Sequence, residues 1–305
     1  MSNSVIDNVK IDYLLVRMDF FLYSSPNMVY CVVEGKSDVA LFGKLLTDNV
    51  KFDDCFWDNE YGLFKEIFKD GCGKVETLIK MYDHNHDKYN NRHRLIGIRD
   101  KDYEEKPACE RIFFCDFCCA EMMVIGNVNC FKAICKEFYC NNMLNCYNNN
   151  CSSGLHEIRL SCLKHLESLS RLRKYNYDNQ CGYNLTILDT KLIYYDDVNK
   201  MNDDIIEKLK ISNNDKDINE LINIFNDCRK ETGDSSLEDL LDITNGHDFS
   251  KIFVQMCKKY RSENYRQEDI ESGLRISFNK EYFRNTNLYN DLKKYQEKNM
   301  LRIVD

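Results

Sequence analysis

Carboxylate side chains follow two short apolar runs of this sequence. Glu34 comes directly after the run Val29–Val33, and the pair Asp100 and Asp102 follows Leu95–Ile98 after one arginine. Two aspartates at a spacing of two can face one cation, and their hard oxygen atoms favour Mg²⁺ or Mn²⁺. The spacing therefore predicts a site for a divalent cation.

The run before Glu34 predicts a strand that is buried on both faces, because its residues do not alternate with polar ones. Ser37 is the predicted N-cap of a following helix, so the strand would deliver Glu34 to its carboxyl end, where open α/β sheets bind ligands. Asp38 lies in the first turn of that helix and can converge with Glu34. In the alternative interpretation, Glu34 is a solvated loop acid and Asp38 complements the helix dipole.

The tripeptide Gly35-Lys36-Ser37 resembles the end of a phosphate-binding P-loop. That loop needs a glycine five positions before Gly35, and Tyr30 stands there. We therefore do not expect an NTPase. Lys36 and Lys101 lie beside the acids, where each could contact a substrate phosphate or be solvated or ion-paired.

Further elements are predicted before residue 125. The stretch 50–57, which mixes apolar with acidic residues, and the apolar stretch 111–115 predict strands. Residues 75–82 predict a helix, and 6–23 predict an apolar helix that covers the sheet. Strands that alternate with helices indicate a mostly parallel sheet flanked by helices. We expect an α/β catalytic domain over residues 1–125.

The pattern becomes mainly helical over residues 126–305, which we expect to pack on the first domain. The clearest amphipathic helix spans 154–174, and its basic residues include Arg159 and Arg171. This basic side could bind a nucleic-acid backbone or simply be solvated. The other predicted segments are a strand pair or helix start at 185–195, acidic helices at 203–243, and two final helices near 267–275 and 279–298.

Composition restricts the class of protein. The chain has 305 residues, of which 43% are hydrophobic and 30% charged, an ordinary globular balance. It shows no secretory signal and no apolar run near 18 residues, so we expect a cytoplasmic protein without a membrane segment. The net charge of −8 argues against a generally basic nucleic-acid-binding surface.

Sixteen cysteines stand in the sequence. In a long chain without an export signal we expect free thiols. Cys135, Cys140, Cys146 and Cys151 are regularly spaced, but their gaps do not match the paired knuckles of zinc sites.

His247 and Asp248 stand at the predicted start of another helix. Asn245 or Asp248 could cap this helix while His247 makes a structural hydrogen bond. The alternative is that His247 contributes to substrate or partner binding.

The two acidic segments together resemble the signature of the TOPRIM fold, in which a strand ending in E-G-x-x-D is followed by a strand ending in D-x-D. Here the signature reads Glu34-Gly35, Asp38, Asp100 and Asp102, and the resemblance covers roughly residues 28–125. Weaker similarity extends to the AriB-type effector family of PARIS anti-phage systems and lies at 113–123, 245–248 and 274–288.

The resemblance implies a metal-dependent nuclease toxin. It implies that an ABC-type ATPase partner controls the protein and that the RNA substrate is host tRNA, and a homodimer is a candidate state. We assign Asp100 and Asp102 as ligands of Mg²⁺ or Mn²⁺, and Glu34 as ligand or general base. Asp38 and Glu121 could hold a second ion.

Three alternatives keep parts of this interpretation. An OLD-type nuclease would use the same chemistry on DNA. A non-catalytic binding module could regulate an ATPase partner, but it would have no need to gather like charges. A D-x-D glycosyltransferase would leave Glu34 and Gly35 unexplained.

Overall fold

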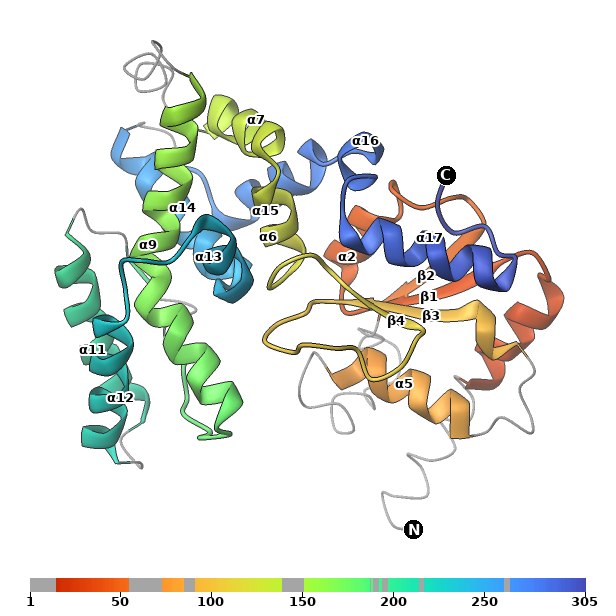
Figure 1. Cartoon of the computed structure of the whole chain (residues 1–305), viewed down its shortest axis with the longest axis horizontal. Coiled ribbons are helices and arrows are strands. Elements are labelled where there is room, and N and C mark those ends of the chain that lie inside the picture. Colours follow the sequence, from red (N-terminus) through yellow and green to blue (C-terminus); the bar gives the residue numbers. More distant parts are fainter. Residues whose placement is uncertain are drawn as a thin grey trace. The chain divides into compact units, whose positions relative to one another are not determined.

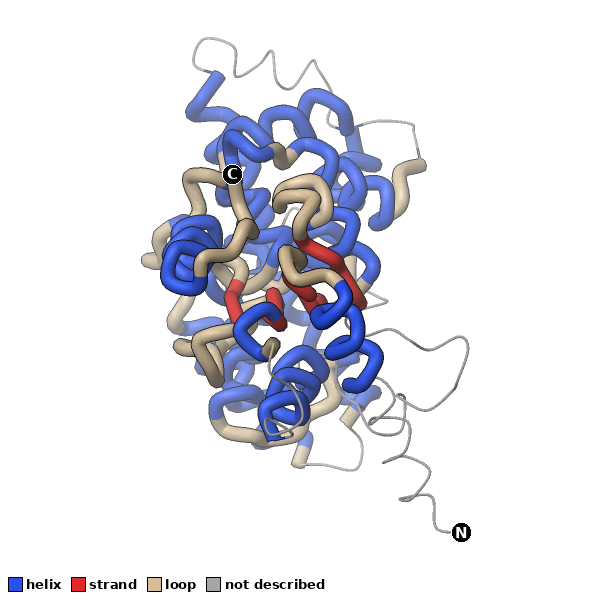
Figure 2. Tube along the Cα trace, turned by 90° about the vertical axis from the view of Figure 1, so that its right-hand side faces the viewer, coloured by secondary structure: helices blue, strands red, loops and turns tan. Residues whose placement is uncertain are grey.

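The fold contains one parallel four-stranded sheet. The computed structural model describes residues 15–54, 73–84, 91–138, 151–186, 188, 192–193, 197–213, 217–260 and 264–305. The strands are β1 (Val29–Val33), β2 (Val50–Asp54), β3 (Leu95–Arg99) and β4 (Ile112–Phe114). They lie in the order β2-β1-β3-β4, and every pair is parallel (Figure 1). Figure 2 shows the strands in red, next to one another and among helices. The predicted α/β fold is confirmed.

Two compact units make up the chain, and each is described by itself. The first comprises Met1–Asp100, Glu104–Cys115 and Asn279–Asp305, and the second comprises Lys101–Tyr103 and Asp116–Phe278. This division differs from the single boundary expected at residue 125, because the last residues of the chain group with the sheet.

Strands β1 and β3 are the two inner strands, and all five residues of each are buried. Parallel strands that are covered on both faces need apolar side chains throughout, which explains their unbroken apolar runs. In the register, Val33 pairs with Ile98, and Arg99 pairs with Phe114. The residues that follow these strands therefore meet at one edge of the sheet.

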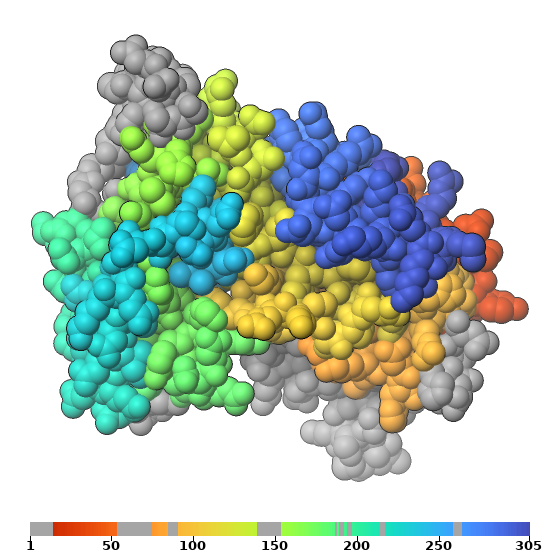
Figure 3. Space-filling model, viewed as in Figure 1, coloured from red at the N-terminus to blue at the C-terminus, as the bar shows by residue number. Residues whose placement is uncertain are grey.

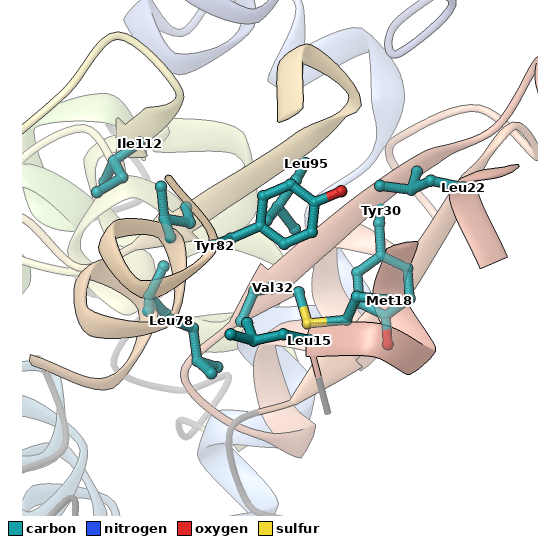
Figure 4. Packing of buried hydrophobic residues seen from close by; sticks show 11 residues of the cluster. Leu15, Met18, Leu22, Tyr30, Val32, Leu78, Tyr82, Leu95 and Ile112 are labelled. Atoms are coloured by element: carbon teal, nitrogen blue, oxygen red, sulfur yellow. The ribbon is translucent and has the colours of Figure 1, made fainter. Parts of the chain in front are cut away.

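One face of the sheet is covered by helical residues 15–24 and by α5 (Gly73–His84). Figure 4 shows their side chains packed with Tyr30, Val32 and Leu95 of the strands. Helix α5 lies very close to β3, since a Cβ atom on Gly97 would be only 2.8 Å from Cδ1 of Ile79. Glycine at this position therefore permits the close packing.

Helix α17 (Asn287–Asn299) lies on the other side of the strands from α5 (Figure 1). The rings of Tyr295 and Phe113 are 5.4 Å apart, and the Tyr295 hydroxyl donates to the carbonyl of His93 at 2.8 Å. The long final helix predicted over 279–298 is instead two, α16 (Lys280–Phe283) and α17. The break lies at Thr286, whose side chain caps α17 by accepting the amide proton of Tyr289.

The second unit is helical in its described part. Its helices are α6 (Ala120–Gly126), α7 (Val128–Phe138), α9 (Cys151–Asp178), α11 (Val198–Ser212), α12 (Ile218–Lys230), α13 (Leu237–Ile243), α14 (Gly246–Tyr260) and α15 (Gln267–Ser277). Helix α9 is the long amphipathic helix expected from the sequence, and α11 and α12 lie beside it (Figure 1 and Figure 3).

Buried aromatic rings and thiols fill this second unit. The rings of Phe131, Phe249 and Phe253 pack together, with centroids 5.8 to 6.3 Å apart. Residues 139–150 lie outside the described residues, and so does most of the segment 185–195 that was predicted as a strand pair or a helix start. Within the described chain, no helix combines the length and the apolar character needed to cross a membrane.

Candidate functional site

The carboxyl ends of the inner strands bring the predicted acids of the first unit to one edge. Glu34 follows β1, Asp100 follows β3, and Cys115 follows β4. The Cys115 amide donates to the carbonyl of Arg99 at 3.0 Å, so the pairing of β3 and β4 continues up to this thiol. The sheet register therefore positions all three side chains at the same end.

The pKa of the Cys115 thiol depends on several of the predicted acids. It is buried, and its pKa is raised well above the ordinary value first by burial and then by the negative charges of Asp100, Asp38 and Glu34. A hydrogen bond to the Asp100 carboxylate raises this pKa further. The negative charges of three predicted acids therefore all raise the pKa of this one buried thiol.

Asp38 also stabilises the start of α2 (Lys36–Phe42). Its Oδ2 accepts the Gly35 amide proton at 2.9 Å, which is the reciprocal half of a capping interaction. The structural role considered for Asp38 was to complement the helix dipole. The structure adds this capping contact, which fixes the carboxylate close to the residue that follows Glu34. Lys36, in the first turn of the same helix, is exposed.

Arg99 is a basic residue of this edge that the sequence analysis missed. Its side chain is only 2% exposed, and its Nε lies 3.6 Å from Oε1 of Glu34. Its other nitrogens pair with Glu76 at 3.4 Å and with Glu104 at 2.9 Å. One signal was available, because an arginine at the end of an otherwise apolar buried strand needs acidic partners.

Asp102 and Lys101 belong to the second unit. Asp102 adopts a left-handed backbone conformation with φ of 49°, and its amide donates to the carbonyl of Cys118 at 2.7 Å. Lys101 pairs with Asp242 at 3.0 Å, which is the ion-paired alternative considered for this lysine.

Glu121, the remaining predicted acid, lies in the first turn of α6 in the second unit. The start of α14 packs directly against it, since a Cβ on Gly246 would lie 2.6 Å from Oε2 of Glu121. Only glycine permits this approach without a shift of the glutamate. A larger residue at position 246 would therefore displace the carboxylate.

His247 makes the structural hydrogen bond that was one of the two interpretations. The side chain of Asn245 accepts the amide protons of His247 and Asp248, at 2.9 and 3.3 Å, and so caps α14. Nδ1 of His247 lies 2.7 Å from Oε1 of Glu271. The hydrogen bond to Glu271 raises the pKa of His247, and burial opposes that shift.

The contact between His247 and Glu271 should make stability depend on pH. A raised pKa in the folded state means that the contact stabilises fully below the unfolded value and is lost as pH rises through the folded value. Because His247 is 60% exposed, we expect the substitution His247→Gln to lower Tm by about 1–3 °C at pH 6. The difference should disappear above pH 8.

Thermal unfolding followed by circular dichroism from pH 5.5 to 8.5 measures this effect. His156→Gln is the matched control, because His156 is an exposed histidine of α9. A His247→Gln difference that stays constant across the range would contradict the assignment.

Asp248 is part of a buried ion pair rather than an exposed binding group. Its two oxygens face Nε and Nη2 of Arg173, at 2.8 and 3.3 Å, and its side chain is 3% exposed. Lys251 adds a longer contact at 3.5 Å. These interactions hold α14 against α9.

The basic side predicted for α9 needs a correction. Arg159 is buried, and its guanidinium donates to the carbonyls of Ile125 and Gly126, at 2.9 and 3.0 Å, where α6 ends. Arg171 pairs with Glu167 and Glu231, at 3.1 and 3.3 Å. Both arginines are engaged within the second unit, because Arg159 satisfies a helix end and Arg171 pairs with the buried Glu167 and the exposed Glu231, which disfavours the predicted substrate contact.

The donor set of the first unit suits a hard divalent cation. Glu34, Asp38 and Asp100 offer carboxylate oxygens, the ligands that Mg²⁺ and Mn²⁺ prefer. Two of the four cysteines considered for zinc, Cys140 and Cys146, lie outside the described residues.

Models of known protein families and curated proteins return no match to this sequence.

Proposed function

We propose that this protein is a metal-dependent nuclease of the TOPRIM type that cleaves phosphodiester bonds. One observation carries the proposal: Glu34 and Asp100 follow the neighbouring parallel strands β1 and β3, which pair Val33 with Ile98, so both carboxylates lie at the same end of the sheet as Cys115. Their negative charges, together with that of Asp38, raise the pKa of the buried Cys115 thiol. Gathering like charges costs energy, and a cation between them offsets that cost. The D-x-D spacing adds Asp102 as a further ligand candidate, and Glu121 stays a candidate for a second ion.

The acidic residues would share the proposed chemistry. Asp100 would hold the cation, with Asp102 a candidate ligand from the D-x-D spacing alone, and Glu34 would either join Asp100 or accept the proton of the attacking water. When bound, Mg²⁺ neutralises charge on the phosphate and lowers the pKa of water. Lys36 is exposed beside Glu34 in the chain and can contact the substrate phosphate.

The substrate and the partner follow from the resemblance of the acidic signature to TOPRIM effectors of anti-phage defence. We propose RNA, and tRNA in particular, as the substrate, with control by an ABC-type ATPase. The cytoplasm would then be the site of action, because tRNA is found there.

Parallel digestion of tRNA and supercoiled plasmid tests this proposal. With Mg²⁺ present, we expect specific cuts in tRNA and none in the plasmid, and EDTA should prevent them. Sequencing of RNA ends from cells that express wild type or Glu34→Ala locates the cut. Cleavage of plasmid alone would assign DNA as the substrate, and cleavage of neither would contradict a nuclease.

A further inference from the structure

We infer that Arg99 is a positioning residue that holds the Glu34 carboxylate for cation binding. This inference rests on the proposed function of the same site. Glu34 follows β1 and Arg99 ends the neighbouring strand β3 in the register that pairs Val33 with Ile98. The guanidinium therefore lies beside Glu34 because of the sheet itself.

The guanidinium of Arg99 is held from several sides. Glu104 pairs with it at 2.9 Å and Glu76 at 3.4 Å, and the ring of Phe114 lies 5.3 Å from its central carbon. Glu76 is itself paired with Lys80 at 2.5 Å on the surface of α5. Arg99 is thus a fixed group against which the Glu34 carboxylate can be oriented.

Burial excludes direct contact between Arg99 and a substrate. The Arg99 side chain is 2% exposed, whereas that of Glu34 is 21% exposed. A nucleic acid could reach the glutamate but not the guanidinium. Arg99 must therefore act through Glu34.

The side chain at position 99 also has to be an arginine for this role. A guanidinium presents five N–H donors in a rigid fork and can face three carboxylates in different directions. A lysine keeps the charge but has one nitrogen on a flexible chain. The variant Arg99→Lys should therefore retain only part of the ability to position Glu34.

One measurement, the change in Mn²⁺ affinity, separates positioning from a simple charge effect. If Arg99 acted only as a positive charge, its removal would tighten Mn²⁺ binding, because the acids would lose a competing cation. If Arg99 positions Glu34, its removal weakens Mn²⁺ binding despite the more negative surroundings. The direction of the change in affinity decides between the two roles.

The experiment uses the full chain with the substitutions Arg99→Met, Arg99→Lys and Glu104→Gln. Glu104→Gln removes the nearest partner of Arg99 and leaves both Arg99 and Glu34 in place. Glu105→Gln, at the exposed next position, is the matched control. Mn²⁺ binding is measured by electron paramagnetic resonance, and kcat and KM for tRNA are measured separately.

For Arg99→Met we expect Mn²⁺ affinity and kcat each to fall by about 10–100-fold, with KM unchanged. Arg99→Lys and Glu104→Gln should fall between this variant and wild type. Unchanged or tighter Mn²⁺ binding by folded Arg99→Met and by Glu104→Gln would overturn the inference.

The proposed function can fail separately. A wild-type protein that binds Mn²⁺ and cleaves no nucleic acid would contradict the proposed nuclease activity. The comparison of Mn²⁺ affinities between wild type and variants would still decide the role of Arg99. A wild type that binds no Mn²⁺ would overturn both.

Discussion

Replacing Glu34 or Asp100 with alanine is expected to abolish nucleic-acid cleavage, with a fall in kcat of about 10³-fold or more. Both carboxylates lie at the carboxyl ends of inner strands, and their charges raise the pKa of the Cys115 thiol. Removing either one would take away a proposed oxygen ligand and a negative charge.

The fold should survive both substitutions, because Glu34 and Asp100 are only half-buried at the end of the sheet. Circular dichroism and thermal unfolding check this, while a gel-based tRNA assay measures cleavage. Glu105→Gln again serves as control, since it removes an exposed acid from the same segment as Asp100. Wild-type cleavage by both alanine variants would refute the site assignment.

The second large effect concerns stability. Asp248→Ala should lower the free energy of unfolding by about 3–5 kcal/mol, because it removes the carboxylate that faces the largely buried guanidinium of Arg173. The two side chains are 3% and 16% exposed, and two nitrogen–oxygen contacts join them. Solvent therefore cannot replace the lost carboxylate.

Urea unfolding of a double-mutant cycle tests this explanation. Asp248→Ala combined with Arg173→Met should be less destabilised than the sum of the single variants, because each single substitution already removes the same contacts between these two side chains. Lys174→Ala breaks an exposed pair with Asp178 on the same helix and should cost less than about 1 kcal/mol. Strict additivity of Asp248→Ala and Arg173→Met would contradict the account.

Local pattern was sufficient to predict the strands and the acids that follow them. Buried parallel strands need continuous apolar runs, so the sequence alone was enough to place Glu34 and Asp100 at one edge of the sheet. Asn245 was one of the two caps predicted for α14 on the same local basis, and it is the one that caps the helix.

Side-chain contacts between residues far apart in the chain could not be predicted from the sequence. Arg99 meets Glu76 of α5, 23 positions earlier in the chain, and no periodicity indicates that contact. Arg159 lies on an amphipathic helix and looks like a surface residue, yet it donates to the end of α6. The pattern of α9 gave no sign that a neighbouring helix would end there.

The C-terminal segment has a consequence for synthesis of the protein on the ribosome. Ile303 and Val304 are buried, and the carbonyl of Ile303 accepts the amide proton of Thr47 at 3.0 Å. Residues 279–305 are translated after the helical unit, although they pack on strands that are translated before it. The nascent chain can fold the helical unit before these residues emerge, whereas α17 can pack on the sheet that carries Glu34 only afterwards.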